Sequence, residues 1–163
     1  MGLSRLDNFL KSVRGTILYV DPSSLDSTDS IENQGNSLTR PFKTIQRALV
    51  ESARFSFLAG SNNDLVEKTS VLLYPGEYIV DNRPGWGIDL SSPDNQLYKL
   101  NSIHGGVIIP RGTSLVGLDL RKTKIRPKYV PNPTNDNIER SCIFRVTGTC
   151  YFWQFSLFDA DPN

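Results

Sequence analysis

The feature that most constrains the fold is a series of short β-type segments in the second half of the chain, with no long helix between them. Each segment is rich in β-branched and aromatic residues, and most are separated by Gly, Pro or Asn. A doubly wound α/β fold needs a helix between successive parallel strands, so it is excluded. An all-β sandwich and a parallel β-helix remain. The predicted strands are 70–74, 77–80, 106–109, 114–117, 123–126, 142–146 and 151–158.

Long polar insertions favour the β-helix over the sandwich. Residues 81–102 and 126–140 interrupt the strand pattern at irregular steps. A solenoid tolerates such insertions, because each emerges at a corner without disturbing the neighbouring coils. We therefore predict a mainly β fold with a β-helix domain over 16–163, which begins with a strand at 16–20 and a polar surface loop at 23–37.

One long helix precedes these strands, and it is predicted over residues 40–59. Pro41 suits the first helical position, and the Gly-Ser-Asn-Asn sequence at 60–63 ends the helix. The apolar stripe of this helix would cover the exposed strand edges of the first coil, as capping elements do in solenoids. The stripe consists of Phe42, Ile45, Leu49, Ala53 and Phe57.

A second, shorter helix is predicted over residues 1–15, with Gly15 placed to end it. Its apolar residues recur at spacings of three and four, which is typical of an amphipathic helix. A helix of this length is marginal in water, so the apolar face needs a surface. That surface is either the chain's own domain or another protein, and the sequence favours neither. We name these residues as candidate partner-binding residues: Leu3, Leu6, Phe9, Leu10 and Val13.

Composition and charge exclude several classes of partner. The 163 residues are 38% hydrophobic, which suffices for a core, yet no apolar run reaches the ~20 residues that a transmembrane helix needs. The 18 basic and 17 acidic residues leave a net charge of +1, so we expect neither nucleic acid nor a membrane as partner. The one basic run is interpreted as a solvated strand flank: Arg121, Lys122, Lys124, Arg126 and Lys128.

The sequence contains no motif for a metal, a cofactor or a catalytic triad. His104 is the only histidine, and Cys142 and Cys150 are the only cysteines, so we expect no Cys/His metal site. Free, buried thiols are favoured over a disulfide. The candidate carboxylates are scattered through loops and strand ends, and we predict a noncatalytic protein. They are Asp89, Asp94, Asp119, Asp136 and Glu139, of which Asp119 is interpreted as a turn residue.

Trp86 is the aromatic residue of most functional interest. It lies in the loop sequence Arg-Pro-Gly-Trp-Gly rather than in a strand. A tryptophan in such a position can contact a glycan or a neighbouring subunit, because its large ring suits both kinds of interface.

Several segments in order resemble the start of right-handed parallel β-helix proteins of the pectin-lyase-like superfamily. They are Val20-Asp-Pro, the polar loop, Arg40-Pro-Phe-Lys-Thr-Ile-Gln-Arg-Ala-Leu, Val71-Leu-Leu-Tyr-Pro-Gly-Glu-Tyr and Ile109-Pro-Arg-Gly-Thr-Ser-Leu-Val-Gly. The resemblance covers about residues 16–126 and implies a right-handed β-helix. It says little about activity, since fold and function separate readily.

The whole chain, including its first twelve residues, resembles the start of large virion proteins of tailed bacteriophages that infect marine cyanobacteria. The resemblance implies a structural part of the tail, baseplate or fibre, made in the host cytoplasm and ending in the virion. It also implies other tail or baseplate proteins as partners, a homotrimer, and a host-surface glycan as a ligand downstream. We expect the N-terminal portion of a longer chain, because the sequence stops just after a predicted strand. The alternatives left open are a carbohydrate-active enzyme (a polysaccharide lyase or hydrolase) and a glycan-binding module of the same fold.

Overall fold

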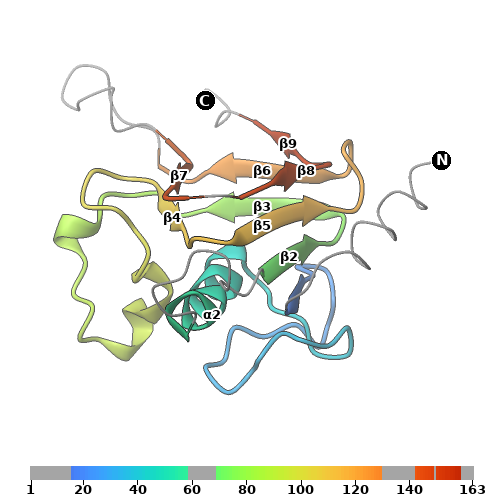
Figure 1. Ribbon diagram of the computed structural model, residues 1–163, viewed down its shortest axis with the longest axis horizontal. Coiled ribbons are helices and arrows are strands. Elements are labelled where there is room, and N and C mark those ends of the chain that lie inside the picture. Colours follow the sequence, from blue (N-terminus) through green and yellow to red (C-terminus); the bar gives the residue numbers. More distant parts are fainter. Residues whose placement is uncertain (1–15, 59–68, 130–141, 149, 159–163) are drawn as a thin grey trace.

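The computed structural model describes residues 16–58, 69–129, 142–148 and 150–158, with the side chains of 55–58 left aside. Within these residues short strands predominate, so the predicted mainly β class is confirmed. The predicted N-terminal helix at 1–15 lies outside the described residues. The ribbon is shown in Figure 1.

The described strands form three sheets, and every pairing between strands is parallel. This pairing argues against an antiparallel sandwich. Sheet A has the order β1 (Ile17–Val20), β2 (Thr69–Leu73), β5 (Thr113–Gly117), β8 (Phe152–Trp153). Sheet B consists of β3 (Gly76–Val80), β6 (Thr123–Pro127) and β9 (Ser156–Leu157), and sheet C of β4 (Val107–Ile109) and β7 (Phe144–Val146).

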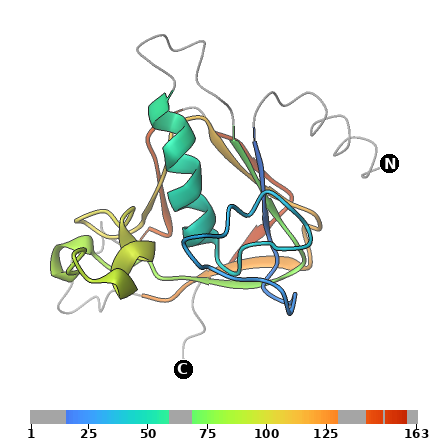
Figure 2. The same ribbon diagram turned by 90° about the horizontal axis from the view of Figure 1, so that it is seen from below.

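From β2 onward the chain visits the sheets in rotation, A, B, C, A, B, C, A, B. We call one pass of the chain through the three sheets a circuit. The strand that each circuit adds to a sheet lies beside the strand of the previous circuit, so residues on the same face of the sheet are paired with one another. Leu18, Val71, Leu115 and Phe152 form such a row across sheet A. Figure 2 shows the three sides around a shared interior.

The interior is one apolar cluster to which all three sheets contribute. Alternate residues of each strand point inward, as the two-residue strand period requires. Val71 and Leu73 of β2, Val107 of β4 and Ile125 of β6 are among its fully buried members. Burying such side chains contributes ~1.5–3 kcal/mol each relative to leaving them in water. The core thus lies between the three sheets rather than between two layers.

The corner between β2 and β3 is held by a buried tyrosine. The sequence predicts strands at 70–74 and 77–80, and in the structure β2 and β3 belong to two different sheets. The Tyr78 hydroxyl lies 2.6 Å from the Tyr74 carbonyl and 3.1 Å from the Val20 carbonyl, which accept its hydrogen bond. Burial raises the pKa of Tyr78 well above its usual value, so the hydroxyl keeps its proton.

The long helix α2 spans Ile45–Leu58, so the prediction that it starts at residue 40 is wrong. Pro41 and Phe42 are extended, and Phe42 forms a bridge with Val20 instead. The Phe42 amide donates to the Tyr19 carbonyl at 2.8 Å, and the Phe42 carbonyl accepts from the Asp21 amide at 2.9 Å. This pairing outweighs the preference of proline for a first helical turn.

Two side chains accept hydrogen bonds from backbone amides at the start of α2. Thr44 Oγ1 accepts from the Arg47 amide at 3.2 Å. Asp29 Oδ1, from the polar loop, accepts from the amides of Lys43 at 2.9 Å and Thr44 at 3.1 Å. Free amides at a helix start favour a negative charge, so Asp29 fixes this end of α2 from a distant part of the sequence.

α2 lies against the first strands of the stack. It places Ile45, Ala48 and Leu49 in the core and packs against β1, β2 and β3. Figure 1 shows α2 at the end of the stack remote from β9. Of the apolar stripe predicted for this helix, Ile45 and Leu49 bury the interior at that end. Phe42 is buried but precedes the helix, Ala53 is only partly buried, and the side chain of Phe57 lies outside the described residues.

The segment predicted as one strand over 151–158 is two short strands in different sheets. β8 ends at Trp153 and β9 begins at Ser156. Gln154 between them has φ of 53°, in the left-handed region that non-glycine residues seldom adopt. The chain passes from sheet A to sheet B at Gln154. The alternation of apolar and polar residues did not indicate this turn, because glutamine is not a usual turn residue.

The loop-to-helix cap gives a first prediction. Asp29→Ala removes the acceptor of two helix-start hydrogen bonds and should lower the free energy of unfolding by about 1 kcal/mol, the usual cost of a lost cap. Urea denaturation followed by circular dichroism measures the change. Asp26→Ala, in the same exposed loop, is the matched control and should leave stability within about 0.5 kcal/mol. Equal effects of the two substitutions would contradict the capping role.

Candidate functional site

The five candidate partner-binding residues lie outside the described residues. Leu3, Leu6, Phe9, Leu10 and Val13 belong to the segment 1–15, which directly precedes the edge strand β1. The structure therefore fixes where this segment joins the fold, and the partner-binding role stays a prediction.

Trp86 is presented to solvent by a loop with a fixed base. It lies in a short 3-10 helix, η2 (Gly85–Gly87), and is 77% exposed. Asn101 Nδ2 donates to the carbonyls of Asp81 and Arg83, both at 2.9 Å, and closes the neck of the loop. The ring is thus available for contact, while the backbone beneath it is held, and the role in glycan or subunit contact stays a prediction.

The predicted carboxylates serve local turns where the structure describes them. Asp119 Oδ1 accepts from the amides of Arg121 and Lys122 at 2.8 and 3.0 Å, so its interpretation as a turn residue is confirmed. Asp89 Oδ1 accepts from the Ser91 amide and hydroxyl. The loop that carries Asp89 lies on the opposite side of the stack from the β5–β6 turn (Figure 1).

No group of three or more His, Cys, Asp and Glu side chains in the described part of the chain could hold a metal ion. Asp94 lies at the start of a second 3-10 helix, η3 (Pro93–Tyr98), and Asp136 and Glu139 fall outside the described residues. Of the candidate carboxylates that the structure describes, Asp89 and Asp119 therefore hold local turns.

Both cysteines are free thiols, as predicted, but they are half-buried rather than fully buried. Cys150 packs against the core, and burial raises its pKa. Cys142 lies with its Sγ 3.8 Å from the Gly105 carbonyl. The incomplete burial follows from their place in the last described circuit, where fewer neighbours surround them.

The basic run on β6 is partly neutralised by the neighbouring circuit. Arg126 pairs with Glu77 at 3.0 Å, and Lys128 pairs with Asp81 at 3.3 Å. Lys124 lies 5.6 Å from the centre of the Phe158 ring. Pairing of this kind fits the interpretation as a strand flank rather than a surface for phosphate groups.

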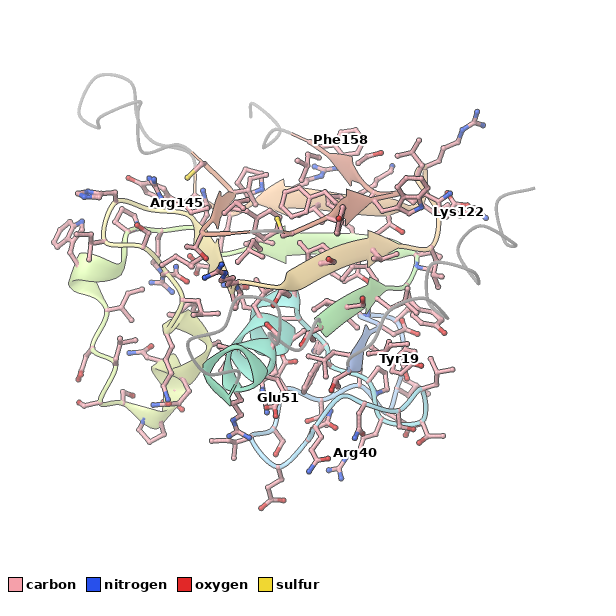
Figure 3. The ribbon with its side chains drawn as sticks, viewed as in Figure 1. Tyr19, Arg40, Glu51, Lys122, Arg145 and Phe158 are labelled. Atoms are coloured by element: carbon pink, nitrogen blue, oxygen red, sulfur yellow. The ribbon has the colours of Figure 1, made fainter. Side chains whose placement is uncertain are left out.

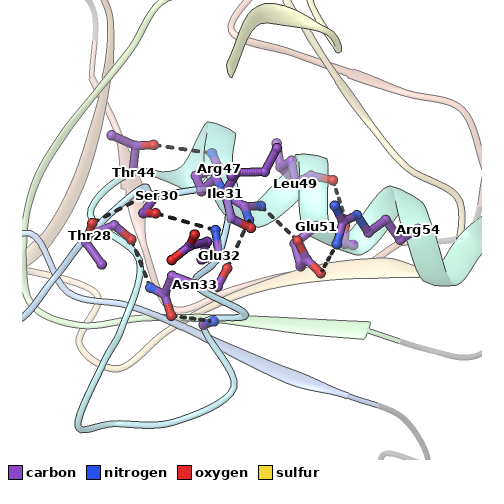
Figure 4. A network of polar contacts seen from close by, with 12 residues as sticks. Thr28, Ser30, Ile31, Glu32, Asn33, Thr44, Arg47, Leu49, Glu51 and Arg54 are labelled. Carbon is purple, nitrogen blue, oxygen red and sulfur yellow. Dashed lines mark hydrogen bonds and ion pairs between the residues drawn. The ribbon is translucent and has the colours of Figure 1, made fainter. Parts of the chain in front are cut away.

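A buried polar network beneath the loop was not predicted from the sequence. Arg47 is buried, pairs with Glu51 at 2.9 Å, and donates to the carbonyls of Ile31 and Asn33 (Figure 4). Its guanidinium carbon also lies 4.7 Å from the centre of the Phe42 ring. The spacing of four between Arg47 and Glu51 was a visible signal for the pair, but nothing in it indicated burial. With its hydrogen bonds used inside the fold, Arg47 has a structural role.

A groove of about 650 Å³ lies beside this network, between α2 and η3. Its apolar lining includes Val50, Ala53, Leu97 and Leu100, and Arg54 and Asp94 stand at its margin. Grooves of this size and polarity suit small ligands. The charged groups at the margin are of both signs, so the groove selects no particular ligand charge.

The end of the stack remote from α2 exposes apolar side chains. Within the described residues, β7, β8 and β9 are each paired with a strand on one side only. Figure 3 shows Phe158 at this end and Arg40 near the opposite one. The exposed apolar residues here are Val146, Tyr151, Phe152, Trp153, Leu157 and Phe158.

The sequence pattern does not distinguish the last described circuit from an interior one. Phe152 continues the inward row through Leu115, yet it is 41% exposed. Unpaired strand edges with apolar neighbours are sites at which further strands add. We therefore regard this open end as the candidate assembly surface.

No helix in the described residues is long and apolar enough to cross a membrane. Comparison of the chain with family models, curated proteins and solved structures finds no match.

The turn at Asp119 predicts a dependence of stability on pH. Hydrogen bonds from the Arg121 and Lys122 amides lower the pKa of Asp119 in the folded state. The stabilisation is therefore complete above the unfolded-state pKa and is lost as the pH falls through the folded-state value. Asp119→Asn should lower the urea midpoint at pH 7 and reduce its fall on acidification. Asp26→Asn is the control, and a variant that retained the full acid dependence would contradict this role of the carboxylate.

Proposed function

We propose that this chain is a noncatalytic structural protein of a phage virion, which attaches through its N-terminal segment and begins an elongated β-helical spike or fibre. The observation that carries the proposal is the asymmetric stack, closed by α2 at one end and open at the other. Parallel strands that add circuit by circuit make a rod whose length is set by the number of circuits.

The rotation of the chain through sheets A, B and C supports a parallel β-helix. The in-register rows inside the coil and the position of α2 are what a capped solenoid requires. The sequence resemblance to pectin-lyase-like proteins adds the right-handed sense to the proposal. In this reading α2 is the capping helix.

The open end supports growth of the rod beyond Phe158. Phe152 and Leu157 continue inward rows and are 41% and 52% exposed, so an added circuit would bury them. The unpaired edges of β8 and β9 would then gain backbone partners in the same register. An added circuit belongs to the same protein in this proposal, and three such rods form the homotrimer.

The N-terminal segment supplies the attachment to other tail or baseplate proteins. Its apolar residues follow helical spacing, which is how an amphipathic helix binds an apolar groove. The segment joins the fold at β1, beside the closed end, so the open end stays clear for the rod. In this proposal the protein is made in the host cytoplasm and resides in the virion tail.

A glycan-binding role remains the second candidate, and the exposure of Trp86 favours it. A flat, exposed ring on a held loop can stack on a sugar face. A carbohydrate-active enzyme of the same fold would need two carboxylates across one bond. Asp89 and Asp119 instead hold turns, so we place any host-surface glycan chemistry further along the rod.

Incorporation into particles tests the attachment. Leu6→Asp with Phe9→Asp places two charges on the apolar face and should reduce incorporation at least tenfold, because a buried unpaired charge is costly. Quantitative immunoblotting of purified particles measures it. Asn8→Asp with Ser12→Asp adds the same charge to the polar face and should incorporate normally. Normal incorporation of the first variant would reject the attachment role.

Trp86→Ala tests the second candidate. Because the ring is mostly exposed, the substitution should change the free energy of unfolding by less than about 0.5 kcal/mol. The unsubstituted chain and the Trp86→Ala variant should give the same signal on a glycan array, because the proposal assigns this chain no glycan site. A signal that disappears with Trp86→Ala, at unchanged stability, would establish the binding module instead.

A further inference from the structure

The backbone that carries Trp86 is fixed, whereas its ring is free. The Gly85 amide donates to the Ser102 carbonyl at 2.8 Å, and the Asn101 side chain closes the neck of the same loop. The Trp86 ring is 77% exposed, and a Cβ added at Gly87 would meet no described residue within 4 Å apart from its chain neighbours. A large ring on a fixed backbone loses little entropy on binding, so it is suited to anchor a partner.

Further contacts hold the rest of this loop in shape. The Arg83 guanidinium pairs with Asp81 at 3.0 Å and lies 4.7 Å from the centre of the Tyr98 ring. Gln96 Nε2 donates to the Leu90 carbonyl at 3.2 Å. Through these contacts η2, which presents the ring, and η3, which packs against α2, keep fixed positions within one loop.

The groove between α2 and η3 has room for an apolar group. Its volume is about 650 Å³, and the apolar side chains that line it are only partly buried: Val50, Ala53, Leu97 and Leu100. Charged groups of both signs stand at its margin, which favours an uncharged occupant. An aromatic ring meets these requirements, because it is flat, apolar and uncharged.

The chain's own Trp86 does not fill this groove. The ring is not among the groove's lining residues and faces solvent instead. The loop that carries the ring also forms one wall of the groove through η3, and its hydrogen bonds hold both parts in place. A ring and a groove that are kept apart in one copy can meet between two copies.

We propose that Trp86 of one copy of this chain inserts into the groove between α2 and η3 of a second copy. The two surfaces are different, so the contact is heterologous: each copy gives its ring to one neighbour and receives a ring from another. Contacts of this kind close into rings, and the number of three copies rests on the proposed function. The inference assigns Trp86 to a contact between subunits.

The contact is weak by itself. An aromatic side chain buries about 150–250 Å², far below the about 1,200 Å² of a stable interface. Isolated chains therefore associate at high concentration, and the rod strengthens the contact by holding copies side by side. In dilute solution the ring is exposed as in the single chain, and Trp86→Ala has little effect on stability there.

Sedimentation velocity of the 163-residue chain up to about 1 mM tests the contact. The unsubstituted chain should approach the mass of three chains. Trp86→Ala removes the ring, and Ala53→Arg fills the groove with a charged side chain, so each should lower the mass about threefold. Ile79→Ala removes an exposed apolar side chain from sheet B and is the matched control, with the mass unchanged.

An equal mixture of the two variants gives the sharper result. The Ala53→Arg chain still offers its ring, and the Trp86→Ala chain still offers its groove, so the mixture should form pairs and nothing larger. Circular dichroism shows whether the Ala53→Arg chain is folded. Val50→Arg, at another position of the groove on α2, takes its place if it is not.

A mixture that stays monomeric would overturn the proposal, and so would an unsubstituted chain that is monomeric at about 1 mM. The homotrimer of the proposed function is judged separately, by the mass of the unsubstituted chain. A mass of three chains that neither variant lowers rejects this contact and keeps the homotrimer. Mixed pairs together with an unsubstituted mass of two chains support the contact and reject the homotrimer.

Discussion

The structure depends on the in-register stacking of like side chains from successive circuits. Val71, Leu115 and Phe152 show the rule, since each lies beside the equivalent residue of the next strand in sheet A. Parallel pairing fixes this register, because a slip of one residue would turn an entire inward row outward. Short strands suffice for the same reason: each is stabilised by its neighbours above and below rather than by its own length.

The closed end relies on polar interactions as much as on apolar burial. Arg47 and Glu51 are buried as a pair, and Arg47 also satisfies backbone carbonyls of the polar loop. Removing one member of such a pair leaves an uncompensated charge, so the two residues, the loop and the helix form one unit. Asp29 also belongs to this unit, because its carboxylate accepts hydrogen bonds from the amides of Lys43 and Thr44 at the start of α2. A loop with hardly any apolar residues is thereby ordered by its hydrogen bonds.

The sequence predicted most strands and the helix, and it failed where long-range pairing decides. Thr113–Gly117 and Thr123–Pro127 lie within a residue of their predicted ends, because glycine and alternation mark them. Phe42 was assigned to the helix, since its bridge to Val20 cannot be read from neighbouring residues. Gln154 turns a corner without a turn signature. At the site, the loop position of Trp86 was predicted, whereas its exposure and the burial of Arg47 depend on what the fold brings together.

The two ends of the stack offer different surfaces. The closed end uses Phe42 and Ile45 internally, and the mostly apolar groove between α2 and η3 lies beside it. At the open end, Phe152 and Leu157 are the last residues of the inward rows and are exposed. The last described strands also have unpaired backbone edges, and such an edge pairs with a strand rather than with a helix. The open end therefore differs in chemistry from the closed end. In the proposed function, this difference lets the closed end complete the fold while the open end accepts the next circuit of the rod.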